Sequence, residues 1–162
     1  MFITNHVLSG AVLGLATPRR PLLVALTAAG SHYALDSVAH WGTPDKQKFR
    51  RAAIVDGLCG LSTMAGVMRI VPRGTRVAVL AGMLGAAFPD SDKPAEMFFH
   101  RSPFPLWVDE FHSAIQHESG RGIRTEVRAA AVMAAAVVVL SGARRLSPVG
   151  LDPPAVSRNR AA

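Results

Sequence analysis

Short turns rich in proline, glycine and arginine divide the apolar sequence of this chain, and this division limits the folds that it can adopt. Turns of this kind occur at residues 18–21 and 72–74, and each separates two apolar segments in which alanine is frequent. No segment alternates apolar and polar residues as a half-buried strand does, so the pattern favours helices. The sequence therefore predicts an all-α fold built from two helical hairpins and a C-terminal helix.

Proline, glycine and charged residues mark the ends of the expected helices. Helices are predicted over residues 5–17, 22–41, 52–71, 75–88, 107–118 and 126–140, of which the fifth is short and amphipathic. Residues 90–105 are predicted to form a loop. A length of 162 residues allows one domain, predicted over 1–146, and the remainder, 147–162, is predicted to be a disordered tail because proline, arginine and alanine dominate it.

Hydrophobicity favours a membrane protein over the alternative, a soluble helical bundle. Hydrophobic residues make up 49% of the chain, and the mean hydropathy is +0.25, although no stretch reaches the ~20 uninterrupted apolar residues of a simple spanning helix. Gly10 and Gly14 lie four residues apart. In a membrane this spacing lets helices approach closely, whereas in water each glycine costs ~1 kcal/mol of helix propensity. We therefore expect a small multi-pass bundle in the cell membrane.

The positive charge is distributed as in loops that flank membrane helices. The chain has 18 Lys and Arg against 11 Asp and Glu, a formal charge of +7. Arginines such as Arg19 and Arg73 lie in the turns between apolar segments, and aromatic residues, at 6%, are too few for base stacking. The pattern indicates membrane lipid as a partner and argues against nucleic acid.

Three chemically active side chains are predicted to share one helix. His32, Asp36 and His40 are spaced at i, i+4 and i+8 within the second expected helix. Each step of four residues advances about 40° around a helix axis, so the three groups form one polar stripe. Imidazoles and a carboxylate at this spacing can share a divalent cation, or the carboxylate can orient a histidine. The single cysteine excludes a thiolate cluster.

The two hairpins bring further polar groups to one end of the bundle. His6 and His32 lie about 13 and 12 residues from the first turn, so antiparallel helices rising about 1.5 Å per residue place them at nearly equal height. Asp56 and Asp90 lie about 17 and 16 residues from the second turn, so the same argument places them at nearly equal height. We expect His6 to approach His32 within ligand-sharing distance, and Asp56 and Asp90 to join the same site, remote from both turns.

The carboxylates need partners. Asp56 lies among apolar residues, where an unpaired carboxylate would cost several kcal/mol, so it is expected to bind a polar group or a metal, or to cap a helix. Asp90 and Asp92 lie two residues apart just beyond a helix, where both can turn toward one cation. Two like charges at this spacing need a counter-ion, which is a metal, Arg101 or Lys93.

The remaining histidines follow later in the chain. His112 lies on the amphipathic helix, three residues after Asp109 and four before Gln116. This trio is consistent with a metal ligand and the groups that orient it. His100 and His117 are expected to be surface residues.

In order and context these motifs resemble the bacterial membrane-bound metal-dependent hydrolase family. The resemblance covers about residues 1–118 and rests on the following elements: Asn5-His6 with Gly10, Ser31-His32 with Asp36 and His40-Trp41, Asp56-Gly57, Pro89-Asp90-Ser91-Asp92, and Phe111-His112. The sequence departs from the family's pattern at Lys93, where a histidine is common. The segment from His32-Tyr33 to Asp36 also bears a shorter, weaker resemblance to zinc-dependent phospholipase C enzymes.

The family resemblance implies a small multi-pass protein with a divalent-metal site and a hydrolytic role. The ligands that it implies are His6, His32, Asp36, His40, Asp90 and Asp92. Together with the spacing arguments, it leads us to expect a membrane-embedded hydrolase in which His6, His32, Asp36 and Asp90 hold zinc or another divalent ion, with His40 and His112 as further candidate ligands.

A metal-activated water would be the nucleophile of this hydrolase, and Asp92 or Asp56 its general base. The expected substrate is a lipid, a phosphoester or another amphiphile. The alternative is a non-catalytic integral membrane protein whose His and Asp groups bind or move a cation or a proton.

Overall fold

The computed structural model of the protein describes residues 1–146, and the predicted tail, 147–162, lies outside the described residues. Helices dominate the described part, which confirms the all-α prediction. The α-helices are α1 (Ile3–Ala16), α2 (Pro21–Asp36), α3 (Lys46–Ile70), α4 (Arg76–Ala87), α5 (Asp92–Phe99), α6 (Leu106–Ile115) and α7 (Ile123–Leu146). Two 3-10 helices, η1 (Arg73–Thr75) and η2 (Phe88–Ser91), flank α4, and the two-residue strands β1 (His40–Trp41) and β2 (Glu118–Ser119) pair in parallel.

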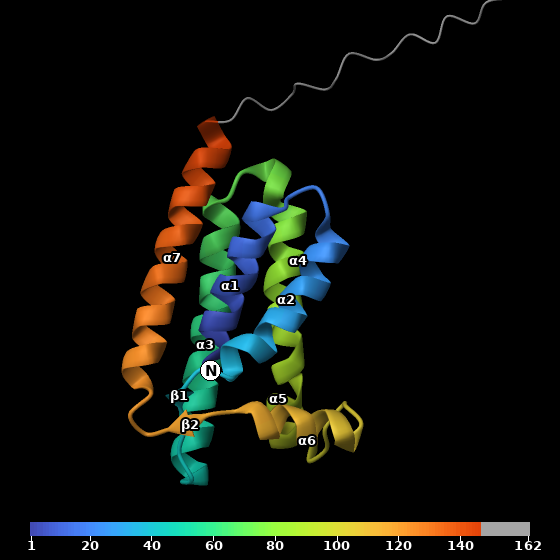
Figure 1. Ribbon diagram of the computed structural model, residues 1–162, viewed down its shortest axis with the longest axis vertical. Coiled ribbons are helices and arrows are strands. Elements are labelled where there is room, and N and C mark those ends of the chain that lie inside the picture. Colours follow the sequence, from blue (N-terminus) through green and yellow to red (C-terminus); the bar gives the residue numbers. More distant parts are fainter. Residues whose placement is uncertain (147–162) are drawn as a thin grey trace, which may run out of the picture.

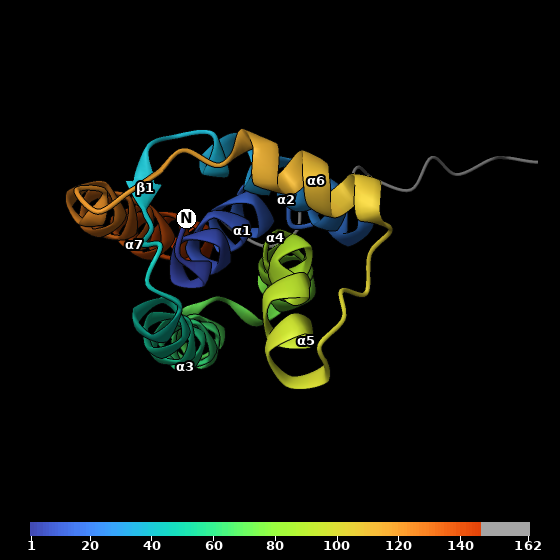
Figure 2. The ribbon, with the colours of Figure 1, turned by 90° about the horizontal axis from the view of Figure 1, so that it is seen from below.

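Helix α1 lies at the centre of the bundle. It contacts α2, α3, α4 and α7, which surround it, while α5 and α6 lie across one end (Figures 1 and 2). The core consists mainly of apolar side chains of α1 and α4, including Val7, Leu15, Val79 and Met83. A helix buried on every side needs apolar residues all round, which explains why the first segment of the sequence shows no polar face.

Direct backbone contact between helices positions α1, α2 and α4. A Cβ atom added to Gly10 of α1 would overlap the backbone of Gly82 in α4, and a Cβ atom added to Gly82 would overlap that of Gly10. Gly85 of α4 likewise lies against the backbone of Ala25 in α2. The expected role of the small residues in close helix packing is therefore confirmed, and α4 packs against both helices of the first hairpin.

The outer surface of the bundle is largely apolar. Two of the described helices, α3 and α7, are long and apolar enough to cross a membrane. The 25 residues of α3 span about 37 Å, against a hydrocarbon core of about 30 Å. Large apolar side chains are exposed along several helices: Leu22, Leu26, Leu58, Leu61, Val127, Val132, Val138 and Val139.

Several helix ends differ from the predicted ones. α3 begins at Lys46 and not at residue 52, because the carboxylate of Asp45 accepts hydrogen bonds from the N–H groups of Gln47 and Lys48 and so caps the helix. α7 is longer than the predicted helix at both ends. The predicted loop over 90–105 contains α5, which ends at Phe99 and is followed by His100 in a left-handed conformation with φ 56°.

The end of α2 is the difference that matters most for the site. The second predicted helix stops at Asp36, where the N–H of Ser37 bonds to the carbonyl of Tyr33 and the chain then turns away. His40 lies beyond this turn, in β1. The prediction that His32, Asp36 and His40 form one helical stripe is therefore wrong for His40. His32 and Asp36 do share a face of α2.

Candidate metal centre

Four buried or half-buried side chains converge. The segments that carry them meet at the end of the bundle remote from the turns that join α1 to α2 and α3 to α4 (Figure 1). They are His32 and Asp36 of α2, Asp90 of η2 and His112 of α6. Each offers one ligand atom, and these atoms all lie within 4.8 Å of one another. We call these four residues the candidate metal centre.

The local structure explains why these residues meet. His32 and Asp36 are four residues apart on α2, so their side chains lie one turn apart on the same face. Pro89 lies in η2, the tighter helix that follows α4 and carries Asp90. α6 crosses the end of the bundle and brings His112 against α2 (Figure 2).

The separations between the ligand atoms are within a few tenths of an ångström of those around a tetrahedral ion for five of the pairs. Zinc ligands at about 2.0–2.2 Å from the ion are about 3.3–3.6 Å from one another. Nε2 of His32 lies 3.3 Å from Oδ2 of Asp36 and 3.1 Å from Nε2 of His112. Nε2 of His112 is 2.9 Å from Oδ2 of Asp36, and both Nε2 atoms are 3.8 Å from Oδ1 of Asp90. The residues therefore fit a divalent ion.

Neighbouring groups orient the two histidines. Nδ1 of His32 donates a hydrogen bond of 2.8 Å to the carbonyl of Ala86, which directs the lone pair of Nε2 toward the centre. Nδ1 of His112 lies 3.7 Å from Oδ2 of Asp92. The structure thus places Asp92 behind a histidine of the centre, on the side away from Asp36, where a carboxylate orients the ring and increases its basicity.

The electrostatics around α5 and α6 favour positive charge. Burial by itself lowers the pKa of His112, but the hydrogen bond with Asp36 and the nearby Asp92 carboxylate outweigh this effect and raise the pKa to about 9. Burial disfavours the carboxylate of Asp92, yet His112 and Lys93 hold its pKa below the usual value. Burial also disfavours the Lys93 ammonium group, but Asp92 and Asp90 raise its pKa. The carboxylates therefore stabilise cations here, as a metal centre requires.

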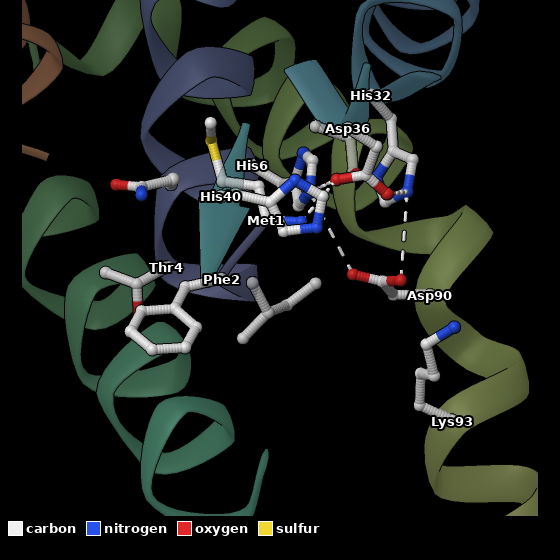
Figure 3. A network of polar contacts seen from close by, with 12 residues as sticks. Met1, Phe2, Thr4, His6, His32, Asp36, His40, Asp90 and Lys93 are labelled. Carbon is white, nitrogen blue, oxygen red and sulfur yellow. Dashed lines mark hydrogen bonds and ion pairs between the residues drawn. The ribbon is translucent and has the colours of Figure 1, made fainter. Parts of the chain in front are cut away.

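His6 lies directly beside the centre. Its ring stacks on that of His32 with 3.8 Å between centroids, which confirms the predicted approach of these two histidines. Nε2 of His6 donates to Oδ1 of Asp36 at 3.0 Å and lies 4.0 Å from Oδ2 of Asp90. Figure 3 shows both imidazoles facing the same two carboxylates.

His40 and Asp56 lie outside the four-residue centre. His40 is buried in β1, and its Nδ1 donates to the carbonyl of Val38 at 2.8 Å. Asp56 accepts hydrogen bonds from the N–H groups of Ile3 and Thr4 and from the Thr4 hydroxyl. The carboxylate thus has the polar partners that its apolar surroundings demanded, and it caps α1 from a neighbouring helix.

Glu126 is a structurally important carboxylate that the sequence analysis did not single out. It is 2% exposed, and its carboxylate accepts hydrogen bonds from the side chain of Asn5 and the N–H groups of Phe2 and Trp41. Glu126 of α7 and Asp56 of α3 together bind the first N–H groups of α1 and so set the height of His6. The sequence did contain a signal for this residue, because Glu126 is a single carboxylate in an Ala/Val-rich segment.

A cavity of about 540 Å³ opens beside the centre. Its walls are mostly apolar side chains of α3 and α5, including Leu58, Leu61 and Phe98. Asp90 and Lys93 line its polar part, so the cavity and the metal centre share a residue. Small-molecule sites have volumes of about 300–1,000 Å³ and a few polar groups among apolar walls, and this cavity has both properties.

Comparison with known proteins leaves the family open. No protein-family model matches the sequence, and neither curated proteins nor solved structures give a match. The resemblance to membrane-bound metal-dependent hydrolases therefore stays a prediction from short motifs. Any functional proposal must come from the geometry of the site.

Proposed function

We propose that the protein is a membrane-embedded, metal-dependent hydrolase that acts on a lipid, a phosphoester or another amphiphile. The observation that carries this proposal is the convergence of His32, Asp36, Asp90 and His112 at the polar end of an apolar cavity.

A divalent cation accounts for the centre better than a purely structural role. Nε2 of His32 has a lone pair when its Nδ1 donates to Ala86, and it faces a second ring nitrogen and two carboxylates. One cation can satisfy all four ligand atoms, whereas protons can satisfy only part of the set. The combination of two imidazole and two carboxylate ligands close together favours zinc.

The residues around the centre have distinct roles in this proposal. With four protein ligands, a zinc ion here would take a water only as a fifth ligand; it would lower the pKa of that water from 15.7 to about 7, which would supply a nucleophile at neutral pH. His32, Asp36, Asp90 and His112 hold the ion, and Asp92 orients His112. Asp92 and Asp56 remain the candidates for the general base, and Asp56 also lines the cavity.

The cavity supports an amphiphilic substrate with an anionic head. The apolar walls suit a hydrocarbon chain. Three carboxylates, of Asp56, Asp90 and Glu118, line the cavity together with Lys93, whose ammonium group is paired with Asp92, so an anionic head requires the cation at the centre. The exposed apolar residues of α3, such as Leu58 and Leu61, also line this cavity, so a lipid chain can reach it from the apolar surface of the bundle. A phosphoester lipid has a hydrocarbon chain for the apolar walls and an anionic head for the polar part of the cavity.

Membrane embedding rests on two observations. Helices α3 and α7 have the length and composition of spanning helices, and large apolar side chains cover their outer faces. Contiguous apolar patches larger than a few hundred Å² are rare on soluble monomers, so exposed apolar faces of this kind favour a membrane. Extraction of the protein from membranes by salt or carbonate without detergent would contradict this placement.

The activity is tested with protein purified in detergent, stripped with a chelator and reconstituted with zinc. We expect zinc-dependent hydrolysis of phosphoester lipids in mixed micelles, lost in His32→Ala and Asp90→Asn and retained in His117→Ala, whose side chain is exposed. Zinc binding without hydrolysis of a broad lipid and phosphoester panel would favour the alternative, a cation- or proton-binding membrane protein. In that alternative, protons would move along the hydrogen bonds that link His6 and His112 to the two oxygens of Asp36.

A further inference from the structure

We infer that the centre holds two divalent cations, with the second bound by His6 on the opposite side of the Asp36 and Asp90 carboxylates. The inference rests on the proposed function, because it extends the same site from one ion to two. Both carboxylates would then bridge the pair.

The two oxygens of Asp36 face different histidines. Oδ2 lies 2.9 Å from Nε2 of His112 and 3.3 Å from Nε2 of His32. Oδ1 lies 3.0 Å from Nε2 of His6. The amino group of Met1 lies 2.5 Å from the same Oδ1, and a cation bound at this oxygen would take its place. Asp36 is fully buried and presents one oxygen to each side.

The two oxygens of Asp90 also face different histidines. Its Oδ1 is 3.8 Å from Nε2 of His32 and of His112, whereas its Oδ2 is 4.0 Å from Nε2 of His6. Figure 3 shows the two oxygens of Asp90 directed at different imidazoles. Asp36 and Asp90 therefore each direct one oxygen at His32 and His112 and the other oxygen at His6. Carboxylates that bridge two ions have this arrangement.

The spacing of the histidines fits such a pair. The rings of His6 and His32 are stacked with 3.8 Å between centroids and 24° between planes. Nearly parallel imidazoles that each bind a separate ion hold those ions about as far apart as the rings themselves. Catalytic two-metal sites have ions about 3.5–4 Å apart, so the stacking distance lies within the required range.

The ligand sets of the two positions differ in a way that suits catalysis. The first position has four protein ligands: His32, Asp36, Asp90 and His112. The second has three, namely His6 and the other oxygens of Asp36 and Asp90, and so leaves a coordination position for water or substrate. A second cation also changes the sign of the local charge, because two divalent ions exceed the three carboxylates of Asp36, Asp90 and Asp92. This excess attracts an anionic substrate.

Metal stoichiometry tests the inference on the full chain in detergent. Metal-free protein is titrated with zinc, and bound zinc per chain is measured after removal of free metal. We expect two zinc ions in the wild type, one in His6→Gln, and two in the control His117→Ala. One ion in the wild type would overturn the inference and leave the proposed function standing, whereas none would overturn both. Two ions in His6→Gln would contradict the assignment of His6.

Manganese provides a second measurement that needs no variant to fold. In wild-type protein loaded with Mn²⁺, the electron paramagnetic resonance spectrum is expected to show a spin-coupled pair, as carboxylate-bridged ions at this distance require. A spectrum of isolated Mn²⁺ at saturating metal would overturn the bridged arrangement. Circular dichroism of His6→Gln establishes whether loss of an ion reflects loss of a ligand or of the fold.

Discussion

The carboxylate of Asp36 lies 2.9 Å from Nε2 of His112, although 76 residues separate the two in the chain. Asp36 is the last residue of α2, and His112 lies on the helix that crosses the end of the bundle. This contact joins the first hairpin to the segment after α5, and it supplies two of the four ligand atoms of the candidate metal centre. Asp36 and His112 are therefore candidate metal ligands and also link α2 to α6.

Loss of either member of the α2 pair is expected to abolish metal binding at the centre. His32→Ala removes one ligand atom, and Asp36→Asn removes an anionic ligand that faces three histidines. Loss of a group that only orients a metal ligand already costs 10 to 100-fold in affinity, so loss of the ligand itself should cost more. Elemental analysis of detergent-purified protein measures the effect. His117→Ala should match the wild type, and a metal-free wild type would refute the hydrolase proposal together with its site.

Asp92→Asn separates an orienting role from a ligand role. The structure places Asp92 against Nδ1 of His112, so the variant should bind zinc about 10 to 100-fold more weakly but still reach the wild-type zinc content at saturating metal. Competition with a chromogenic chelator gives the affinity. Asp109→Asn on α6, the helix that carries His112, is the matched control; Asp109 accepts a hydrogen bond from Ser102, and the variant should leave affinity unchanged. A lower zinc content at saturation would show that Asp92 is itself a ligand.

The sequence predicted the parts of the site that depend on local geometry. Helices rise by a fixed distance per residue, so counting from the first turn placed His6 beside His32. The i, i+4 spacing likewise brought Asp36 to His32. His40 failed the same reasoning because the helix ended at Asp36, and helix ends are set by competing turns that periodicity does not reveal.

Contacts between residues far apart in the sequence could not be predicted from local spacing. The position of His112 depends on how α6 folds back across the bundle, which no spacing in the sequence encodes. The same holds for Asp56 and Glu126, because their partners are the N–H groups of a helix that became central only through packing. For α5, Pro94 in its first turn was a usable signal for a helix start within the predicted loop.

Asp56→Ala should destabilise the protein without removing metal from the centre. The variant leaves the N–H groups of Ile3 and Thr4 without their carboxylate, and loss of a helix cap costs about 0.5–2 kcal/mol. Thermal unfolding in detergent should therefore shift to lower temperature, while zinc content stays at the wild-type value. Asp45→Ala removes a cap from an exposed helix end and provides the comparison. If Asp56→Ala keeps its stability and zinc but loses hydrolysis, Asp56 acts as the general base.

Gly82→Ala tests whether the close approach of α1 and α4 holds the site together. A Cβ atom at residue 82 would overlap the backbone of Gly10, and backbone cannot move aside as a flexible side chain does. The helices must separate, and overpacking of this kind costs about 1–3 kcal/mol. Because His6 lies on α1 and Asp90 follows α4, the separation should also weaken zinc binding.

Gly66→Ala on α3 is the matched control for this substitution. A Cβ atom at residue 66 meets no other atom within 4 Å, and alanine is a better helix former than glycine by up to about 1 kcal/mol. The unfolding temperature of Gly66→Ala should therefore equal or exceed that of the wild type, while that of Gly82→Ala falls. Equal unfolding temperatures and equal zinc affinities for the two variants would mean that backbone contact between α1 and α4 does not position the metal centre.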